Sequence, residues 1–199
     1  MSFDATWEAV HAQREWGRYP PEELVRFMAR RVPVGAQVLD LGCGSGACLW
    51  YLAREGYRPT GIDGSASACA RASAYAPVVQ GDLIALPFED ASFDVAIDIC
   101  AIQHNGWDET RAIVREVIRV LRPAGLFFSM LVAEGTSSQP YIGKGRVTFF
   151  DRSRVDALFA DLRDVTVDRS DRTDGGGALT ISHFVVSAMR PPIDPDVHV

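Results

Sequence analysis

The sequence predicts an α/β protein in which helices cover both faces of a mostly parallel sheet. Three observations support this. Along residues 37–132, short apolar runs typical of buried strands alternate with helical segments. The run that ends at Leu41 is followed by Gly42, Gly44 and Gly46, which suit a tight turn into a helix. A chain of 199 residues, 47% of them hydrophobic, is long enough for one well-buried core and too short for two comfortable domains.

The individual elements follow from hydrophobic period and from turn residues. Helices are expected over residues 21–31, 46–55, 66–75, 107–121 and 152–160, and strands over residues 37–41, 57–63, 78–80, 93–99, 126–132, 163–169 and 178–188. Pro21 suits the first turn of its helix, and Ser65 is a good N-cap. The last two strands have no helix between them, so they predict an antiparallel hairpin that turns through residues 174–177.

Composition narrows the function classes. A net charge of −6 and a pI of about 5.2 argue against an extended surface for nucleic acid. The chain has no apolar run of about 18 residues and no basic-then-apolar N-terminus, so we expect no membrane span, no export and a cytoplasmic location. Its four cysteines form no C-x-x-C pair and have no histidine at zinc-ligand spacing, so we expect neither a metal site nor a disulfide framework. Cys43 and Cys100 are expected to be small buried thiols.

The glycine turn indicates a nucleotide-type cofactor, because the following helix directs unpaired N–H groups toward it. Its spacing fits two schemes. Gly42-x-Gly44-x-x-Ala47 satisfies the looser dinucleotide fingerprint. Asp40-x-Gly42-x-Gly44-x-Gly46 resembles motif I of the class I S-adenosylmethionine-dependent methyltransferases.

Two further segments favour the second scheme. The segment GDLIALPFEDASFD at residues 81–94 resembles the methyltransferase pattern GD-x-x-x-LPF-x-x-x-SFD. The segment VLRPAGL at residues 120–126 is similar to the family's RVLRPGG, with Ala124 where the family usually has glycine. The carboxylate of Asp63, at the end of the second strand, suits both schemes because either cofactor has a ribose to bind.

The resemblance covers roughly residues 37–132 and implies a fold in detail. It implies a three-layer Rossmann-like methyltransferase fold whose seven strands run in the order 3-2-1-4-5-7-6, with strand 7 antiparallel. S-adenosyl-L-methionine would lie across the carboxyl ends of strands 1, 2 and 4, and the product would be S-adenosyl-L-homocysteine. We expect one methyltransferase domain over residues 1–199, in which 1–32 is an arm and helix covering the site, 133–148 is a candidate lid and 190–199 is a tail.

The resemblance also implies roles along the cofactor. The three glycines would open the turn for the methionine portion and the sugar, and Asp63 would bind the ribose. Asp82 and Leu83 would meet the adenine. Asp40 would contact the amino group through water, or else only interact with a helix dipole or a local backbone partner. Ser65 would follow the adenosine beside Gly64, or else only cap its helix.

An aromatic arm completes the expected cofactor site. Arg18 would pair with the cofactor carboxylate while Trp16 and Tyr19 close over it, unless these rings only pack the first helix onto the sheet. The expected cofactor-binding residues are Trp16, Arg18, Asp40, Gly42, Cys43, Gly44, Gly46, Asp63, Gly64, Ser65, Asp82, Leu83 and Cys100.

His104, just after the fourth strand, is the candidate catalytic base, because an imidazole titrates near neutral pH and that loop faces the methyl group in the family. The alternative is a histidine that only hydrogen-bonds the substrate or the loop. Asn105 is expected to cap the next helix, with Asp108 three residues later. His183 alternates with apolar residues and is expected to pack within the sheet, while His11 on the arm is a weaker third candidate.

The expected function is methylation of a small molecule, since no large appended domain is present to hold a protein or RNA. We expect O-methylation of a sugar or secondary metabolite, by a monomer or homodimer. Lys144 and Arg146, among glycines, suggest a lid that clamps an anionic substrate, or else a solvated loop. N-methylation of an amine, a non-catalytic cofactor-binding regulator and, least favoured, a nicotinamide-dependent oxidoreductase remain as alternatives.

Overall fold

The computed structural model describes residues 4–14, 17–137 and 145–192. Its seven strands form one sheet in the order β3-β2-β1-β4-β5-β7-β6, which confirms the predicted topology. The strands are β1 (Gln37–Leu41), β2 (Arg58–Asp63), β3 (Val78–Gln80), β4 (Phe93–Ile99), β5 (Leu121–Val132), β6 (Arg163–Asp174) and β7 (Leu179–Met189). The helices are α1 (Thr6–Gln13), α2 (Glu22–Arg31), α3 (Ala47–Arg54), α4 (Ala66–Ala72), α5 (Trp107–Val120) and α6 (Arg152–Leu158), with a 3₁₀ turn, η1, over Ile102–His104.

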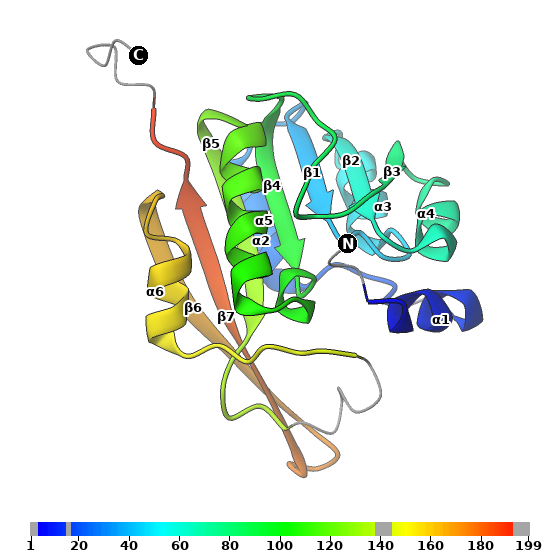
Figure 1. Ribbon diagram of the computed structural model, residues 1–199, viewed down its shortest axis with the longest axis vertical. Coiled ribbons are helices and arrows are strands. Elements are labelled where there is room, and N and C mark those ends of the chain that lie inside the picture. Colours follow the sequence, from blue (N-terminus) through cyan, green and yellow to red (C-terminus); the bar gives the residue numbers. More distant parts are fainter. Residues whose placement is uncertain (1–3, 15–16, 138–144, 193–199) are drawn as a thin grey trace.

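Helices cover the sheet on both faces (Figure 1). Residues of α2 and α3 share one apolar core with β1, β4 and β5, and residues of α5 and α6 share another with the opposite face. β1 pairs in parallel with β2 and β4, and β4 pairs in parallel with β5, whereas β7 runs antiparallel to both its neighbours. The carboxyl ends of β1, β2 and β4 therefore meet at one end of the sheet, where order along the chain reverses.

The start of α5 shows how local chemistry sets the loop that follows β4. Gly106 is the N-cap, and the Glu109 carboxylate accepts a hydrogen bond from its amide over 2.6 Å. The prediction that Asn105 caps this helix is wrong, because its side-chain amide instead donates to the Ile102 carbonyl. The helix buries Ile113 and other apolar residues along one stripe and so fixes this loop against the sheet.

Three elements differ most from the sequence prediction. β5 begins at Leu121, where a strand starting at residue 126 was expected. β6 continues to Asp174 where a strand ending at residue 169 was expected, so the β6–β7 hairpin extends past the carboxyl ends of β1 and β4 (Figure 1). The arm at residues 1–20 contains the helix α1, which packs against α4. α1 has only 8 residues and little apolar periodicity, so its sequence carries a weak helical signal.

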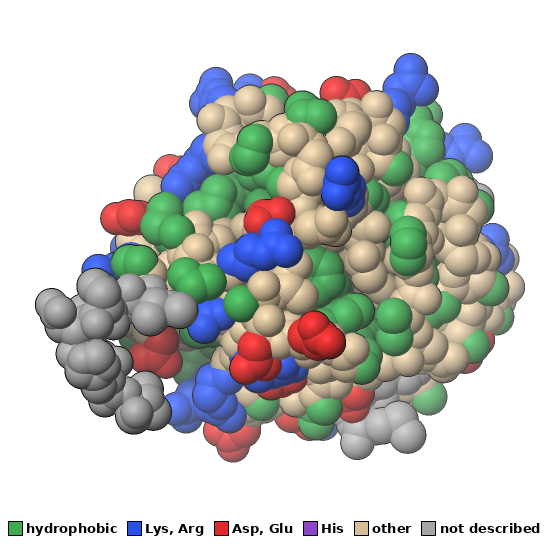
Figure 2. Space-filling view, turned by 90° about the horizontal axis from the view of Figure 1, so that it is seen from above, with side chains coloured by type: hydrophobic (Ala, Val, Ile, Leu, Met, Phe, Trp, Pro, Cys, Tyr) green, Lys and Arg blue, Asp and Glu red, His purple; other side chains and the backbone are tan. Residues whose placement is uncertain are grey.

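At the end of the molecule opposite the carboxyl ends of β1, β2 and β4, the surface carries charges of both signs. Figure 2 shows basic and acidic side chains interspersed there among apolar and other polar atoms. Among the described residues, no helix is both long enough and apolar enough to cross a bilayer.

Candidate functional site

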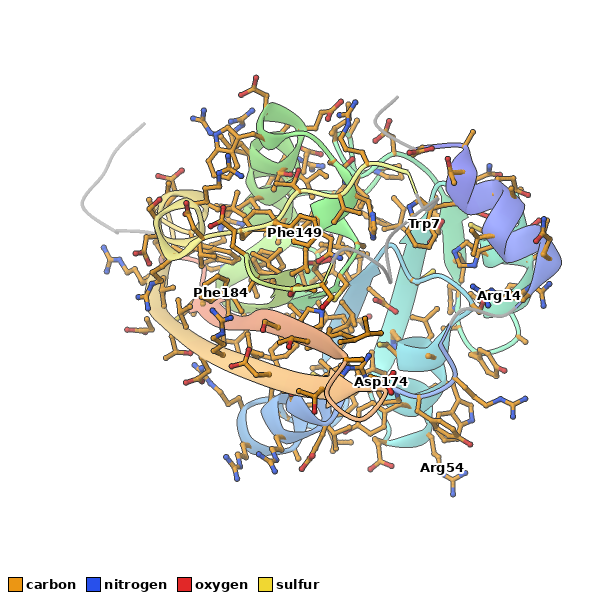
Figure 3. All side chains as sticks on the ribbon, turned by 90° about the horizontal axis from the view of Figure 1, so that it is seen from below. Trp7, Arg14, Arg54, Phe149, Asp174 and Phe184 are labelled. Carbon is orange, nitrogen blue, oxygen red and sulfur yellow. The ribbon has the colours of Figure 1, made fainter. Side chains whose placement is uncertain are left out.

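A cleft of about 720 Å³ opens at the carboxyl ends of β1, β2 and β4. This volume is within the range of sites that hold a drug-sized ligand. Several parts of the chain line it: the glycine turn after β1 and the start of α3, the ends of β2 and β3, the loop after β4, residues within 17–21 before α2, and two flanking elements, α1 and the β6–β7 hairpin. Figure 3 looks toward this end of the sheet, with Trp7 of α1 and Asp174 of the hairpin on opposite sides of the opening.

The turn after β1 has no room for a side chain at its first glycine. Gly42 has a φ of +61°, in the left-handed region, and a Cβ placed on it would overlap the Ala101 methyl group. The glycine turn and the loop after β4 therefore approach each other across the floor of the cleft. Gly42, Cys43 and Gly44 all line the cleft.

Asp63 ends β2 with its carboxylate held by two backbone amides. One oxygen, Oδ2, accepts a hydrogen bond from the Gly44 amide over 2.9 Å, and Oδ1 accepts one from the Ser65 amide over 2.8 Å. Each carboxylate oxygen has a second lone pair, so two acceptor positions remain on a fixed, 7% exposed group that lines the cleft. This arrangement suits a ligand that presents two neighbouring hydroxyl groups.

Asp40 is the second acid on the cleft wall. Burial raises the pKa of this carboxyl, and the negative charges of Asp63 and Asp98 raise it further. Its Oδ2 is buried and has no hydrogen-bond partner among the described residues. A buried, unsatisfied acceptor beside two other acids is costly, so the position suits a ligand that brings a donor or positive charge.

The third acid, Asp82, follows β3 and lines the cleft beside Leu83 and Gly64. Its Oδ1 accepts a hydrogen bond from the Ile84 amide over 3.3 Å, which orients the carboxylate. Leu83 packs on the core of the sheet and offers an apolar surface next to it. The three acids thus lie along the edge formed by β1, β2 and β3.

Three of the expected cofactor residues lie elsewhere. Ser65 is buried as the N-cap of α4, with its hydroxyl accepting from the Ala68 amide. Gly46 begins α3 and faces Tyr75 and Ala72 instead of the cleft. Arg18 is exposed and borders a separate, smaller cavity, so neither it nor these two residues contributes to the cleft wall. Trp16 lies outside the described residues.

A buried acid, Asp98, shapes the loop after β4. Its Oδ1 accepts hydrogen bonds from the amides of Ala101 and Ile102 over 2.8 and 3.1 Å. Its Oδ2 accepts one from the Ser129 hydroxyl over 2.6 Å. Burial raises the pKa of Asp98 to about 6 in spite of these donors. The bonds hold a loop in which Cys100 adopts a φ of +60°, rare for a residue with a side chain.

Both thiols expected at the site line the cleft. Cys43 is buried, whereas Cys100 is half-buried, a departure from the predicted burial. Loss of solvent raises the pKa of each thiol, so both are protonated at neutral pH and are poor nucleophiles.

His104 ends the 3₁₀ turn η1 on the cleft wall. Its Nδ1 lies 2.9 Å from the Arg146 carbonyl oxygen, and its ring contacts Trp7 edge-on with centroids 4.6 Å apart. A carbonyl oxygen only accepts, so Nδ1 carries the hydrogen and the lone pair of the neutral ring lies on Nε2. The ring is thus held in the tautomer that lets Nε2 receive a proton.

Sequence reasoning assigned no role in the site to α1 as a helix. Glu8 docks α1 on α4 by accepting hydrogen bonds from the hydroxyls of Ser65 and Ser67, both over 2.6 Å. This places His11 over the turn, its ring 3.4 Å from a Cβ built on Gly44. Burial lowers the pKa of His11 and favours the neutral ring.

The β6–β7 hairpin supplies the remaining wall. Arg172, Asp174, Leu179, Ile181 and His183 all line the cleft. His183 was expected to pack within the sheet; it lies in β7, and its half-buried ring also borders the cleft. Burial lowers the pKa of His183, and the positive charge of Arg172 lowers it further. The only sequence signal for this wall was the alternation of apolar residues over 179–185. That alternation does not indicate how far the hairpin extends past the other strands.

In the part of the chain that the structure describes, no three His, Cys, Asp or Glu side chains form a group able to hold a metal ion.

Comparisons with known proteins agree with this geometry. Residues 38–125 match the family model described as a methyltransferase domain. The chain is 38% identical over 155 residues to a malonyl-[acyl-carrier protein] O-methyltransferase of Enterobacter lignolyticus, covering 70% of this chain and 58% of that protein. It is 38% identical over 121 residues to a fatty-acid O-methyltransferase of Mycolicibacterium smegmatis, covering 57% of this chain and 43% of that one. It thus spans about half the length of these relatives.

A solved structure has the same fold. It comes from a study of the conversion of a disulfide bond into a thioacetal group during echinomycin biosynthesis. The two structures superpose with a TM-score of 0.75 over 96% of this chain and 93% of that one, at 18% sequence identity.

Proposed function

We propose that this chain is a class I S-adenosylmethionine-dependent methyltransferase and that it transfers a methyl group from S-adenosyl-L-methionine to an oxygen of a small molecule. The observation that carries the proposal is the row of acids, Asp40, Asp63 and Asp82, along the edge of one cleft beside the glycine turn. The printed names of two relatives, an acyl-carrier-protein O-methyltransferase and a fatty-acid O-methyltransferase, support oxygen as the acceptor atom.

The residues present fit the cofactor. Asp63 offers two acceptor positions to the ribose hydroxyls, and Asp82 with Leu83 offers a polar group and an apolar face to the adenine. The unsatisfied Oδ2 of Asp40 suits the cofactor's amino group, directly or through water. Arg18 lies off the cleft, at a smaller cavity, and is not among the residues that would hold the cofactor.

When bound, S-adenosyl-L-methionine supplies a methyl group on a sulfonium, whose departure leaves a neutral thioether. The chain's own contribution is to align the acceptor and to exclude water. The docked helix α1 and the β6–β7 hairpin form two sides of the cleft and restrict access to it.

His104 is the proposed proton acceptor where the acceptor is a neutral hydroxyl. Its Nδ1–H is fixed by the Arg146 carbonyl, so Nε2 is the basic atom, and the Trp7 ring limits its rotation. An acceptor that is already anionic would need no base. In that case His104 would only orient the acceptor.

The test is incubation of the intact chain with methyl-labelled cofactor and a panel of small acids, phenols, sugars and amines. Mass spectrometry would follow S-adenosyl-L-homocysteine and the labelled product. Labelled ethers or esters, formed together with S-adenosyl-L-homocysteine, are the expected result. Products labelled on nitrogen would favour an amine methyltransferase. Tight cofactor binding with no product from any acceptor would favour a regulator.

A further inference from the structure

The hairpin wall of the cleft differs in charge from the β1–β3 edge. Arg172 of β6 pairs with Ile181 of β7, and Asp174 pairs with Leu179. Paired residues in an antiparallel ribbon point to the same face, and residues two apart share that face. Arg172 and the two apolar residues Leu179 and Ile181 therefore present one guanidinium beside an apolar strip, and all three line the cleft.

The Arg172 guanidinium has no hydrogen bond or ion pair within the described ranges 4–14, 17–137 and 145–192. Two carboxylates on this side of the cleft each already accept one hydrogen bond. Asp174 accepts a hydrogen bond from the Gly175 amide over 2.7 Å, and Glu23 of α2 accepts one from the Ser170 hydroxyl over 2.5 Å. By contrast, Arg169 on the opposite face of β6 pairs with Asp171 over 2.9 Å.

The field of Arg172 reaches into the cleft. Burial raises the pKa of the Cys100 thiol and lowers that of His183, and in both cases the charge of Arg172 favours the less protonated form. Cys100 follows β4 at the floor of the cleft, so the guanidinium acts from the hairpin across to the end of the sheet. Asp40, Asp63 and Asp82 lie toward the other edge, whereas Arg172 places a positive charge on the hairpin side, with the carboxylate of Asp174 two residues along the same face.

Resting on the proposed function, we propose that the hairpin wall is the acceptor subsite and that it takes an amphipathic carboxylate, whose charged group pairs with Arg172 and whose apolar chain lies on Leu179 and Ile181. A guanidinium binds a carboxylate through two parallel hydrogen bonds. It offers no such pair to a neutral ester, so the subsite distinguishes an acid from its methyl ester.

The probes are octanoate, octanamide and butanoate, titrated by calorimetry into the intact chain saturated with S-adenosyl-L-homocysteine. Octanoate is expected to bind at least tenfold more tightly than either octanamide, which lacks the charge, or butanoate, which lacks most of the chain. Equal affinities for the acid and the amide, or no octanoate binding while S-adenosyl-L-homocysteine binds normally, would overturn the proposal. Failure of S-adenosyl-L-homocysteine itself to bind would overturn the proposed function instead.

Variants separate the charge from the apolar strip. R172Q is expected to weaken octanoate at least tenfold and to leave octanamide and S-adenosyl-L-homocysteine within twofold. R163Q, the same change at the far end of β6, is the matched control and should alter the affinity for none of the three ligands.

Two further variants test the neighbours of Arg172. D174N removes a competing carboxylate and is expected to increase the affinity for octanoate, while L179S should reduce the difference in affinity between octanoate and butanoate. Equal octanoate affinities in R172Q and R163Q would contradict the role of Arg172.

Discussion

The Asp63 carboxylate accepts a hydrogen bond from the Gly44 amide over 2.9 Å, so the end of β2 and the glycine turn are one connected unit. A ligand bound to Asp63 therefore rests on a group that the turn itself orients. Any change to this carboxylate acts on the cofactor and on the shape of the turn together.

Asp63 is accordingly the first target. D63N leaves one oxygen to serve two amide donors and the ligand, so one interaction on a buried charged group is lost. We expect the affinity for S-adenosyl-L-homocysteine, measured by calorimetry, to fall at least tenfold, about 1.4 kcal/mol. D108N, the same change on the exposed first turn of α5, is the control. Equal affinities in D63N and D108N would exclude Asp63 from the site.

The contact between Gly42 and Ala101 predicts a rescue. G42A places a methyl group where the Ala101 methyl already lies, at a φ of +61°. We expect it to lower the free energy of unfolding by about 2–4 kcal/mol, measured in urea, through strain and overpacking together. The double variant G42A/A101G removes the overlap and should recover part of that loss.

A suitable control for strain alone is G35A. Gly35 has a φ of +88° and open space around the position of a Cβ, so only the backbone cost applies. If A101G gives the same change in the G42A and wild-type backgrounds, the two positions are independent and the contact does not limit the turn.

Asp98 predicts a pH dependence of stability. Burial raises the pKa of Asp98 in the folded protein from 3.8 to about 6. Its contribution to the stability of the folded state is therefore fully present below pH 3.8 and is lost as pH rises through 6. Over that window it should lower the free energy of unfolding by roughly 3 kcal/mol. D98N keeps Oδ1 for the two loop amides and places a donor beside the Ser129 hydroxyl, without a titrating group.

Urea unfolding of wild type and D98N at pH 4, 5, 6 and 7 checks this. As pH rises, the free energy of unfolding of wild type should fall relative to that of D98N, because only wild type has the titrating Asp98. All other titrating groups are common to both proteins. A constant difference across that range would mean that Asp98 does not titrate there.

His104 predicts a split between turnover and cofactor binding. With a neutral hydroxyl acceptor and saturating cofactor, H104N should lower kcat by about 10²–10⁴, the usual contribution of a general base. Its affinity for S-adenosyl-L-homocysteine should stay within twofold. H11N and H183N, at the two other histidines of the cleft, should lower kcat less. A loss below tenfold in H104N would leave the ring only an orienting role.

Much of the fold could be predicted from the sequence because the signals are local and strong. Buried runs such as residues 93–99 and glycines with a forced backbone, such as Gly42, leave few alternatives, and strands alternating with helices determine the parallel pairing. The position of Asp40, Asp63 and Asp82 on the cleft wall could be predicted for the same reason, since each lies at or next to a strand end whose place in the sheet follows from the topology.

The rest of the site depends on contacts between distant segments. α1 reaches the cleft because Glu8 meets Ser65 and Ser67, 57 and 59 residues away, and no local pattern encodes that meeting. Arg172 was missed because the strand was expected to end at residue 169, and a solvated, charged strand such as β6 has little hydrophobic alternation to mark its length. Arg18 was misplaced because spacing along the chain does not say which side of a turn an arm will follow.

The most direct test of the account is a parallel titration of the intact chain with S-adenosyl-L-homocysteine and with NAD⁺, monitored by calorimetry, together with D82N as a variant at the far end of the row of acids. We predict one site for S-adenosyl-L-homocysteine, weakened in D82N, and no heat from NAD⁺. Binding of NAD⁺ without binding of S-adenosyl-L-homocysteine would contradict the account.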